Sequence, residues 1–198
     1  LKTKPTQHSV KVLLENGIQP DVLVLRTEHA LSEELRRKVA LFCNVEFNAV
    51  IESIDVETIY EVPLRMLNEK LDVSVLSKLQ LSLGKTPELN AWRQFLSKLK
   101  NPKRTLNIGL IGKYVELPDA YKSIVEALIH AGSTNETQVN IESIQSEGIN
   151  PENLNEKLSG MNGILVAPGF GHRGIEGKIL AAKYARENSI PFLGICLG

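Results

Sequence analysis

The last five residues of the sequence, Gly-Ile-Cys-Leu-Gly, combine residue types that suit nucleophilic chemistry. They overlap a short apolar run over residues 192–195, which predicts a strand. The spacing Gly194-x-Cys196-x-Gly198 is that of a nucleophile elbow, with cysteine in place of serine. Such a turn holds the nucleophile in a strained backbone conformation, and a Cβ two residues to either side would crowd it. The spacing therefore predicts that Cys196 is a nucleophile, and the alternative is a small buried core cysteine.

A glycine-rich loop upstream is the second stretch whose residue types suit a ligand site. The apolar residues 164–166 predict another strand, and the sequence Gly-Phe-Gly-His-Arg-Gly follows at residues 169–174. Glycines there would let the backbone approach a small polar ligand closely. One predicted helix separates the two strands, so both strand ends are expected at the carboxyl edge of one parallel sheet, where α/β folds bind ligands.

Basic and hydroxyl side chains gather at the start of the sequence. Residues 2–7, Lys-Thr-Lys-Pro-Thr-Gln, precede a helix predicted over residues 8–16. Two lysines, two hydroxyls and free N–H groups before a helix would make a phosphate cradle, and the alternative is a solvated chain end. The basic cluster Arg36-Arg37-Lys38 on a second predicted helix is either a solvated face or a further phosphate contact.

Composition and charge limit the kinds of protein that this sequence can encode. The 198 residues are 42% hydrophobic and 23% charged, which is typical of a soluble globular chain of one or two domains. Lys+Arg and Asp+Glu both number 23, so overall charge favours neither nucleic acid nor a membrane surface. Without a membrane-length apolar run or a signal peptide, we expect a cytoplasmic protein. Two cysteines are too few for a disulfide scaffold and do not suggest a zinc site.

The first 56 residues alternate helical and strand patterns, as a parallel α/β layer does. Besides the helix over residues 8–16, we expect a strand over 21–25, a helix over 33–42 and a strand over 49–51. Ser32 is predicted to cap the second helix, and Asp55 is a candidate cap for a helix that starts there.

Two amphipathic patterns, over residues 72–83 and 88–100, predict a helical linker across residues 72–104. Beyond it, strands and helices alternate again. The predicted strands are 106–111, 139–144, 164–166 and 192–195, and the predicted helices are 119–130, 152–158 and 175–187. This alternation indicates a doubly wound, flavodoxin-like parallel sheet with right-handed crossovers.

With these segments in place, the chain resembles the CTP synthase family from end to end. The matching stretches are residues 2–10, 18–21, 40–45, 59–63, 112–123, 169–177 and 194–198. The resemblance implies the C-terminal part of an amidoligase (synthetase) domain over residues 1–71. It further implies the interdomain linker over 72–104 and the first half of a class I glutamine amidotransferase domain over 105–198.

The family's chemistry is what the resemblance implies for function. Its ligase domain uses ATP with Mg²⁺ to phosphorylate the C4 oxygen of UTP. A cysteine in the second domain attacks the glutamine amide to form a thioester, and the released ammonia displaces the phosphate to give CTP. GTP activates the enzyme, CTP inhibits it, and the family assembles homotetramers. Partners are therefore UTP, CTP, ATP and glutamine, with neither nucleic acid nor membrane.

Site residues follow from the resemblance by position. Cys196 is the nucleophile, and glutamine and its oxyanion are held at Gly169, Leu197 and Gly198. Lys122 lies in the region associated with GTP. The remaining positions contact nucleotides: UTP and CTP at Lys2, Thr3, Lys4, Pro5, Thr6, Gln7 and Lys38, and ATP at Ile54, Asp55 and Val56.

The chain departs from the family in two ways. Where many members have Val-Pro-Gly-Gly-Phe-Gly, this chain has Val-Ala-Pro-Gly-Phe-Gly, so Pro168 removes an N–H near the expected oxyanion. The family's phosphate loop and magnesium carboxylates would precede Leu1, and the histidine and glutamate that activate the cysteine would follow Gly198. We therefore expect an internal piece of a CTP synthase that is inactive alone. The alternative is a non-catalytic nucleotide-binding or interaction module that retains the scaffold.

Overall fold

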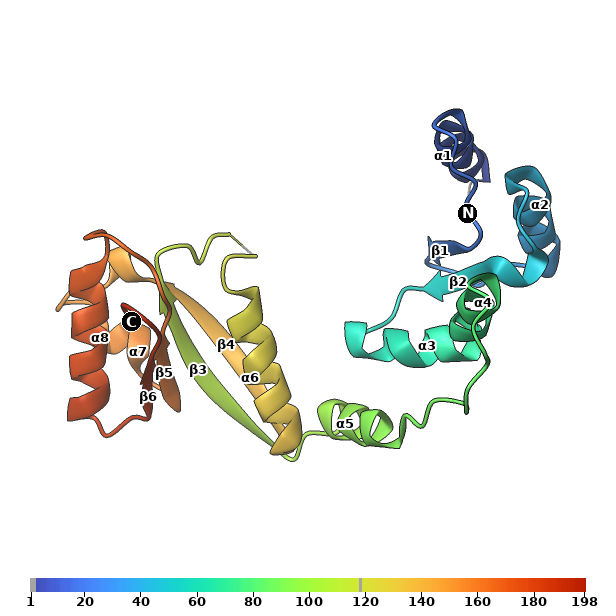
Figure 1. The fold of residues 1–198 in the computed structure, drawn as a ribbon. Helices are drawn as coiled ribbons and strands as arrows, with labels where there is room; N and C mark the ends of the chain where they lie inside the picture. The colour runs from blue at the N-terminus through green and yellow to red at the C-terminus, as the bar shows by residue number, and fades with distance from the viewer. Residues whose placement is uncertain (1–2, 118) are drawn as a thin grey trace. The chain divides into compact units, whose positions relative to one another are not determined.

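A computed structural model describes residues 3–117 and 119–198 of the chain (Figure 1). The chain divides into two compact units, Leu1–Asn90 and Ala91–Gly198, called here the first and second unit. Among the helices of the described residues, none has the length and apolar character needed to cross a membrane. Lys2, one of the predicted nucleotide contacts, lies outside the described residues.

The first unit is built on a parallel pair of strands with helices around it. Its elements are α1 (Thr3–Glu15), β1 (Leu23–Thr27), α2 (Glu33–Cys43), the 3₁₀ helix η1 (Phe47–Ala49), β2 (Val50–Ile54), the 3₁₀ helix η2 (Ile59–Glu61), α3 (Val62–Asn68) and α4 (Leu71–Lys78). Leu23 of β1 stands opposite Val50 of β2. Helices α1 and α2 pack on each other, and their buried Val10 and Val39 share one apolar cluster with both strands.

The start of α1 differs from the sequence prediction. The helix begins at Thr3 rather than at His8, so Thr3, Pro5 and their neighbours form its first turns and are not a loop in front of it. Proline is tolerated in a first helical turn because the N–H that it lacks has no intrahelical partner there.

Of the two predicted caps in this unit, one is confirmed and one is wrong. Ser32 accepts a hydrogen bond from Leu35 N–H at 3.2 Å and caps α2. Asp55 caps no helix: it lies in the loop after β2, and the following 3₁₀ helix is capped by Thr58, whose hydroxyl accepts from Tyr60 N–H at 3.4 Å. A hydroxyl residue closer to the helix start has taken the capping role.

The linker helices are shorter than predicted. Helix α4 ends at Lys78 and the next helix, α5, spans Asn90–Lys100. Between them Gln80 has φ +54°, a left-handed conformation that stops a helix. By its contacts α4 belongs to the first unit, and all of α5 except its first residue belongs to the second.

The second unit confirms the doubly wound sheet. Its elements after α5 are β3 (Arg104–Gly112), α6 (Lys122–Thr134), β4 (Thr137–Gln145), the 3₁₀ helix η3 (Ser146–Gly148), α7 (Leu154–Leu158), β5 (Gly163–Val166), α8 (Ile175–Glu187) and β6 (Phe192–Gly194). The four strands are all parallel, in the order β4-β3-β5-β6. Helix α6 begins three residues later than predicted.

Alternation along the strands places side chains on both faces of this sheet. Ile111 and Val166 face a core with α7 and α8, whereas Leu110 and Leu165 face a core with α6. Figure 1 shows α6 on one side of the sheet and α8 on the other. Because β4 and β5 lie on opposite sides of β3, the chain changes direction there, and the loops after β3 and β5 diverge at a topological switch point.

Candidate active site and nucleotide site

The backbone at Cys196 has the strained conformation expected of a nucleophile elbow. Cys196 lies two residues after β6 with φ +59°, in a region that residues with a Cβ seldom adopt, and the residue is exposed. This places the thiol at the carboxyl edge of the sheet. The alternative of a buried core cysteine is therefore wrong for Cys196, and it describes Cys43, which is fully buried.

The glycines on either side of Cys196 are sterically required. An ideal Cβ on Gly194 would lie 2.3 Å from the carbonyl oxygen of Gly198, and one on Gly198 would lie 2.2 Å from the carbonyl oxygen of Val166. Real Cβ atoms essentially never approach an oxygen so closely. Gly194 thus lies directly against Gly198 within the turn, and Gly198 lies against the end of β5. The glycine spacing predicted such a crowded turn.

Gly169 and Leu197, which the sequence analysis placed at the oxyanion, both have an available backbone N–H. Within the described residues, neither Gly169 N–H nor Leu197 N–H donates to a protein acceptor. The N–H of Gly198 is used inside the turn, donating to Ile195 O at 3.0 Å, and Pro168 has none to offer. Of the three positions predicted to hold glutamine and its oxyanion, Gly169 and Leu197 therefore have donors available, and Gly198 supplies space for the turn.

Two buried lysines lie at the same edge, and sequence reasoning missed both. Lys113 is 3% exposed and Lys178 is 6% exposed. The Lys178 ammonium donates to Ala167 O at 2.9 Å and to Leu197 O at 3.2 Å, which ties the loop after β5 to the elbow. Burial lowers the pKa of Lys178, the positive charge of Lys113 lowers it further, and the charge of Cys196 opposes both.

Lys122, the predicted GTP-region residue, is the first residue of α6 and lies on the surface. Its ammonium pairs with Glu126 one helical turn on, at 2.7 Å. The hydrogen bond from this pair raises the pKa of Lys122, and its Coulomb attraction adds to the effect.

The predicted UTP and CTP contacts of the first unit lie on two adjoining helices. Thr3, Lys4 and the residues that follow form the first turns of α1, and Lys38 lies on α2, which packs against α1 (Figure 1). The neighbours of Lys38 in its basic cluster have partners: Arg36 pairs with Glu69 at 2.7 Å, and Arg37 pairs with Glu33. Within residues 3–117 and 119–198, Lys38 itself makes no ion pair.

The predicted ATP contacts lie where the strands of the first unit end. Ile54 is the last residue of β2, and the N–H of Asp55 donates to Thr27 O at 2.8 Å. The Asp55 carboxylate accepts from Arg26 Nε at 2.8 Å, and this hydrogen bond raises the pKa of the Arg26 guanidinium. Arg26 is a charged neighbour that sequence reasoning missed, because only the pairing of β1 with β2 brings it to Asp55.

The part of the chain that the structure describes holds no cluster of three His, Cys, Asp or Glu side chains that could bind a metal ion.

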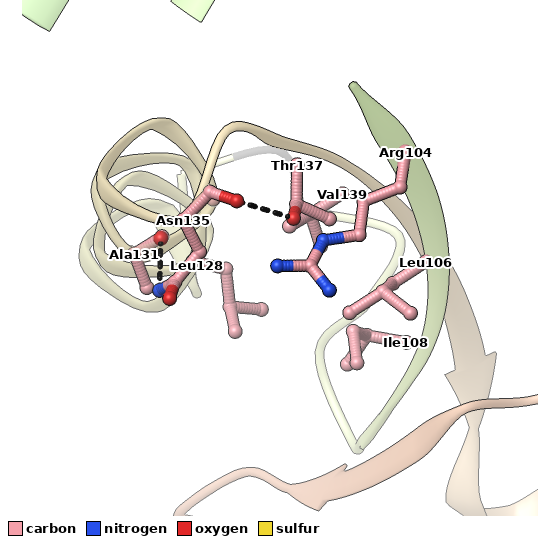
Figure 2. A pocket seen from close by; sticks show the side chains of 9 residues that line it. Arg104, Leu106, Ile108, Leu128, Ala131, Asn135, Thr137 and Val139 are labelled. Atoms are coloured by element: carbon pink, nitrogen blue, oxygen red, sulfur yellow. Dashed lines mark hydrogen bonds between the residues drawn. The ribbon is translucent and has the colours of Figure 1, made fainter. Parts of the chain in front are cut away.

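A cavity of about 350 Å³ in the second unit lies away from Cys196. Figure 2 shows Leu106, Ile108 and Leu128 lining it, with the Arg104 side chain extending over them. Its walls come from the amino-terminal halves of β3 and β4 and from α6, whereas Cys196 follows the carboxyl end of its strand. The cavity is therefore not part of the candidate active site.

Two family models match different parts of the chain. Residues 1–81 match the model described as CTP synthase N-terminus, and residues 116–198 match the model described as glutamine amidotransferase class-I. The elbow and the glycine-rich loop fall in the second match, and α1, α2 and the loop after β2 fall in the first.

Curated relatives match the whole chain. The CTP synthase of Flavobacterium johnsoniae is 65% identical over all 198 residues, that of Cytophaga hutchinsonii is 66% identical, and that of Bacteroides fragilis is 57% identical. The chain spans about 37% of the length of each. A solved structure of the glutaminase domain of Trypanosoma brucei CTPS with bound acivicin is 36% identical, with a TM-score of 0.43, over 47% of this chain and 37% of that one.

Proposed function

Because this chain belongs to the CTP synthase family, we propose that the protein carrying it makes CTP from UTP with ATP and with nitrogen from glutamine. The matched relatives are longer than this chain, so the proposal concerns the complete polypeptide in which these residues occur. The observation that carries it is Cys196, exposed at φ +59° on an elbow with an unpaired N–H at Leu197 beside it and one at Gly169 on the neighbouring loop.

In the amidotransferase half, the Cys196 thiolate attacks the carbonyl carbon of the glutamine side-chain amide. The carbonyl electron pair moves to oxygen, and the N–H groups of Gly169 and Leu197 donate to the oxyanion. Collapse of this intermediate re-forms the carbonyl and breaks the C–N bond, and ammonia leaves once its nitrogen has gained the proton that the thiol released. Water then hydrolyses the thioester to glutamate and restores the thiol. Gly198 shapes the turn that presents the thiol.

In the synthetase half, we assign the UTP phosphates and ring to the first turns of α1 and to Lys38. The ammonium groups of Lys4 and Lys38 supply positive charge that suits the phosphates. ATP is assigned to Ile54, Asp55 and Val56, where Arg26 holds the Asp55 carboxylate. Mg²⁺ with ATP, GTP activation near Lys122 and a homotetramer remain predictions drawn from the family. A cytoplasmic location remains a prediction drawn from the sequence.

The deciding experiment for the amidotransferase assignment is Cys196→Ala in the full-length enzyme. We expect glutamine-dependent CTP formation to disappear while formation from added ammonia persists, since external ammonia bypasses the thioester. Loss of both activities, or survival of the glutamine-dependent one, would overturn the assignment. If the unaltered protein makes no CTP from either nitrogen source, the non-catalytic module is the better description.

The nucleotide assignment is tested by Lys38→Ala. Removing a charge-assisted contact to phosphate costs about 1.5–3 kcal/mol, so affinity for both UTP and CTP should fall roughly ten- to a hundredfold. The matched control is Lys11→Ala on the exposed face of α1, whose lysine pairs with Glu15 at 3.9 Å. Equal UTP dependence of the two variants would remove Lys38 from the site.

A further inference from the structure

Lys113 occupies the switch point of the second sheet. It is the first residue after β3, between the strands β4 and β5 that lie on either side of β3. Its side chain is almost fully buried, although an ammonium leaves water at a high cost unless other groups solvate it. Among the described residues Lys113 forms no ion pair, so carbonyl oxygens supply that solvation.

Those carbonyls belong to the glycine-rich loop. The Lys113 ammonium donates to Phe170 O at 2.8 Å and to Gly171 O at 2.6 Å. Its aliphatic stem packs against the residue before them: an ideal Cβ on Gly169 would lie 3.4 Å from Lys113 Cδ. One side chain therefore bonds two consecutive residues of the loop and lies beside a third, Gly169, whose N–H is unpaired among the described residues.

The backbone from which this side chain extends is itself held on two sides. The N–H groups of Lys113 and Tyr114 donate to the Tyr121 hydroxyl at 3.0 and 3.2 Å, and Gln145 Nε2 donates to Lys113 O at 3.0 Å. The buried Tyr121 ring takes the space that a Cβ on Gly112 would need, 2.6 Å away. The backbone of Lys113 is thus held in place by hydrogen bonds, and its side chain can position the loop.

The loop has few other attachments. Pro168 has no N–H, and within the described residues the N–H groups of residues 169–171 donate to no protein acceptor. The Phe170 side chain is 85% exposed and adds little packing, and Gly171 has φ +85°, which only glycine adopts freely. Lys178 holds the start of the loop at Ala167 O, and Arg173 pairs with Glu147 at 3.1 Å beyond it. Between these points, the position of residues 169–171 depends on the two hydrogen bonds and the stem of Lys113.

We infer that Lys113 is a positioning residue for glutamine hydrolysis, because its ammonium and stem hold the loop so that Gly169 N–H meets the oxyanion formed at Cys196. The inference rests on the proposed function and adds a residue to it. Lys113 does not touch the substrate and acts through the loop.

The test is Lys113→Met in the full-length enzyme, which keeps most of the stem and removes the donors. We expect kcat for glutamine-dependent CTP formation to fall roughly 10–100-fold, because small misplacements and lost oxyanion donors cost about this much. KM for glutamine should change less than about threefold, and the ammonia-dependent rate should be retained. Inactivation by 6-diazo-5-oxo-L-norleucine should slow, whereas alkylation of Cys196 by iodoacetamide should not.

The matched control is Lys183→Met on α8, an exposed lysine that pairs with Glu187 at 3.8 Å. The inference would be overturned if the ratio of glutamine- to ammonia-dependent rate were the same in Lys113→Met and Lys183→Met. It would also be overturned if Lys113→Met slowed inactivation by the glutamine analogue and alkylation by iodoacetamide equally. Cys196→Ala separates the two proposals. The proposed function fails if glutamine-dependent synthesis survives in Cys196→Ala. The inference alone fails if that synthesis is lost in Cys196→Ala but is undiminished in Lys113→Met.

A second variant covers the case in which Lys113→Met does not fold. Tyr121→Phe keeps the buried ring and removes the hydroxyl that accepts from the N–H groups of Lys113 and Tyr114. The ratio of glutamine- to ammonia-dependent rate should then fall at least about threefold, since the anchor of the lysine is loosened. An unchanged ratio in Tyr121→Phe would count against positioning through Lys113.

Discussion

Adding one methyl group at Gly194 should disable glutamine hydrolysis without touching a reacting atom. The Cβ of Gly194→Ala would lie 2.3 Å from Gly198 O and 2.6 Å from Gly198 C. Both are backbone atoms, which cannot rotate away as a flexible side chain would. The φ angle of Gly194 is not in the left-handed region, so alanine suits the backbone and the effect comes from the clash alone.

The size of the effect follows from that distance. The contact is about 1 Å shorter than ordinary van der Waals contact, so the turn that carries Cys196 must move by a comparable amount. A displacement of this size costs roughly 100-fold in rate when it misplaces a reacting group. The strain should also lower the free energy of unfolding by about 1–3 kcal/mol, as overpacking generally does.

The assay compares CTP formation from glutamine and from ammonia in the full-length enzyme, with the melting temperature recorded alongside. Gly84→Ala is the matched control, because no heavy atom lies within 4 Å of its added Cβ and its φ is not left-handed. We expect Gly194→Ala to lose the glutamine-dependent rate selectively, and Gly84→Ala to lose neither. A wild-type glutamine-dependent rate in Gly194→Ala would refute the claim that the elbow is closed too tightly for a Cβ.

Three further predictions concern the thiols and Lys178. Iodoacetamide should modify exposed Cys196 before Cys43, whose burial raises its pKa, and the reverse order in labelled peptides would contradict this. Cys196→Gly should be about 1 kcal/mol more stable to denaturant than Cys196→Ala, because glycine relieves the strain at φ +59°; equal stabilities would show that no strain is stored there. Burial lowers the pKa of Lys178 below its unfolded value, so between those values the unfolded chain binds more protons and stability rises with pH. Lys178→Met should flatten the rise in melting temperature as pH approaches about 10.4, and an identical slope in both proteins would contradict the burial argument.

Local patterns in the sequence were enough for most of the fold. Alternating helical and strand periods predicted the four parallel strands of the second unit, and helix α8 has the predicted bounds, Ile175–Glu187. The glycines flanking Cys196 predicted the strained turn, because a nucleophile elbow needs glycine at fixed positions two residues before and two residues after the nucleophile. The sequence also predicted the Ser32 cap, which depends on residues three positions apart.

Other features were decided only by the tertiary structure. The lysine in Gly-Lys-Tyr gave no sign of being buried, because its acceptors on Phe170 and Gly171 are 57 and 58 residues away. The pairing of Arg26 with Asp55 likewise needed β1 beside β2. Which N–H groups stay unpaired at the elbow depends on where every other acceptor lies. Residue types and spacing determine the local turn and the chemistry available to it, whereas burial and hydrogen-bond partners depend on segments that only the folded sheet brings together.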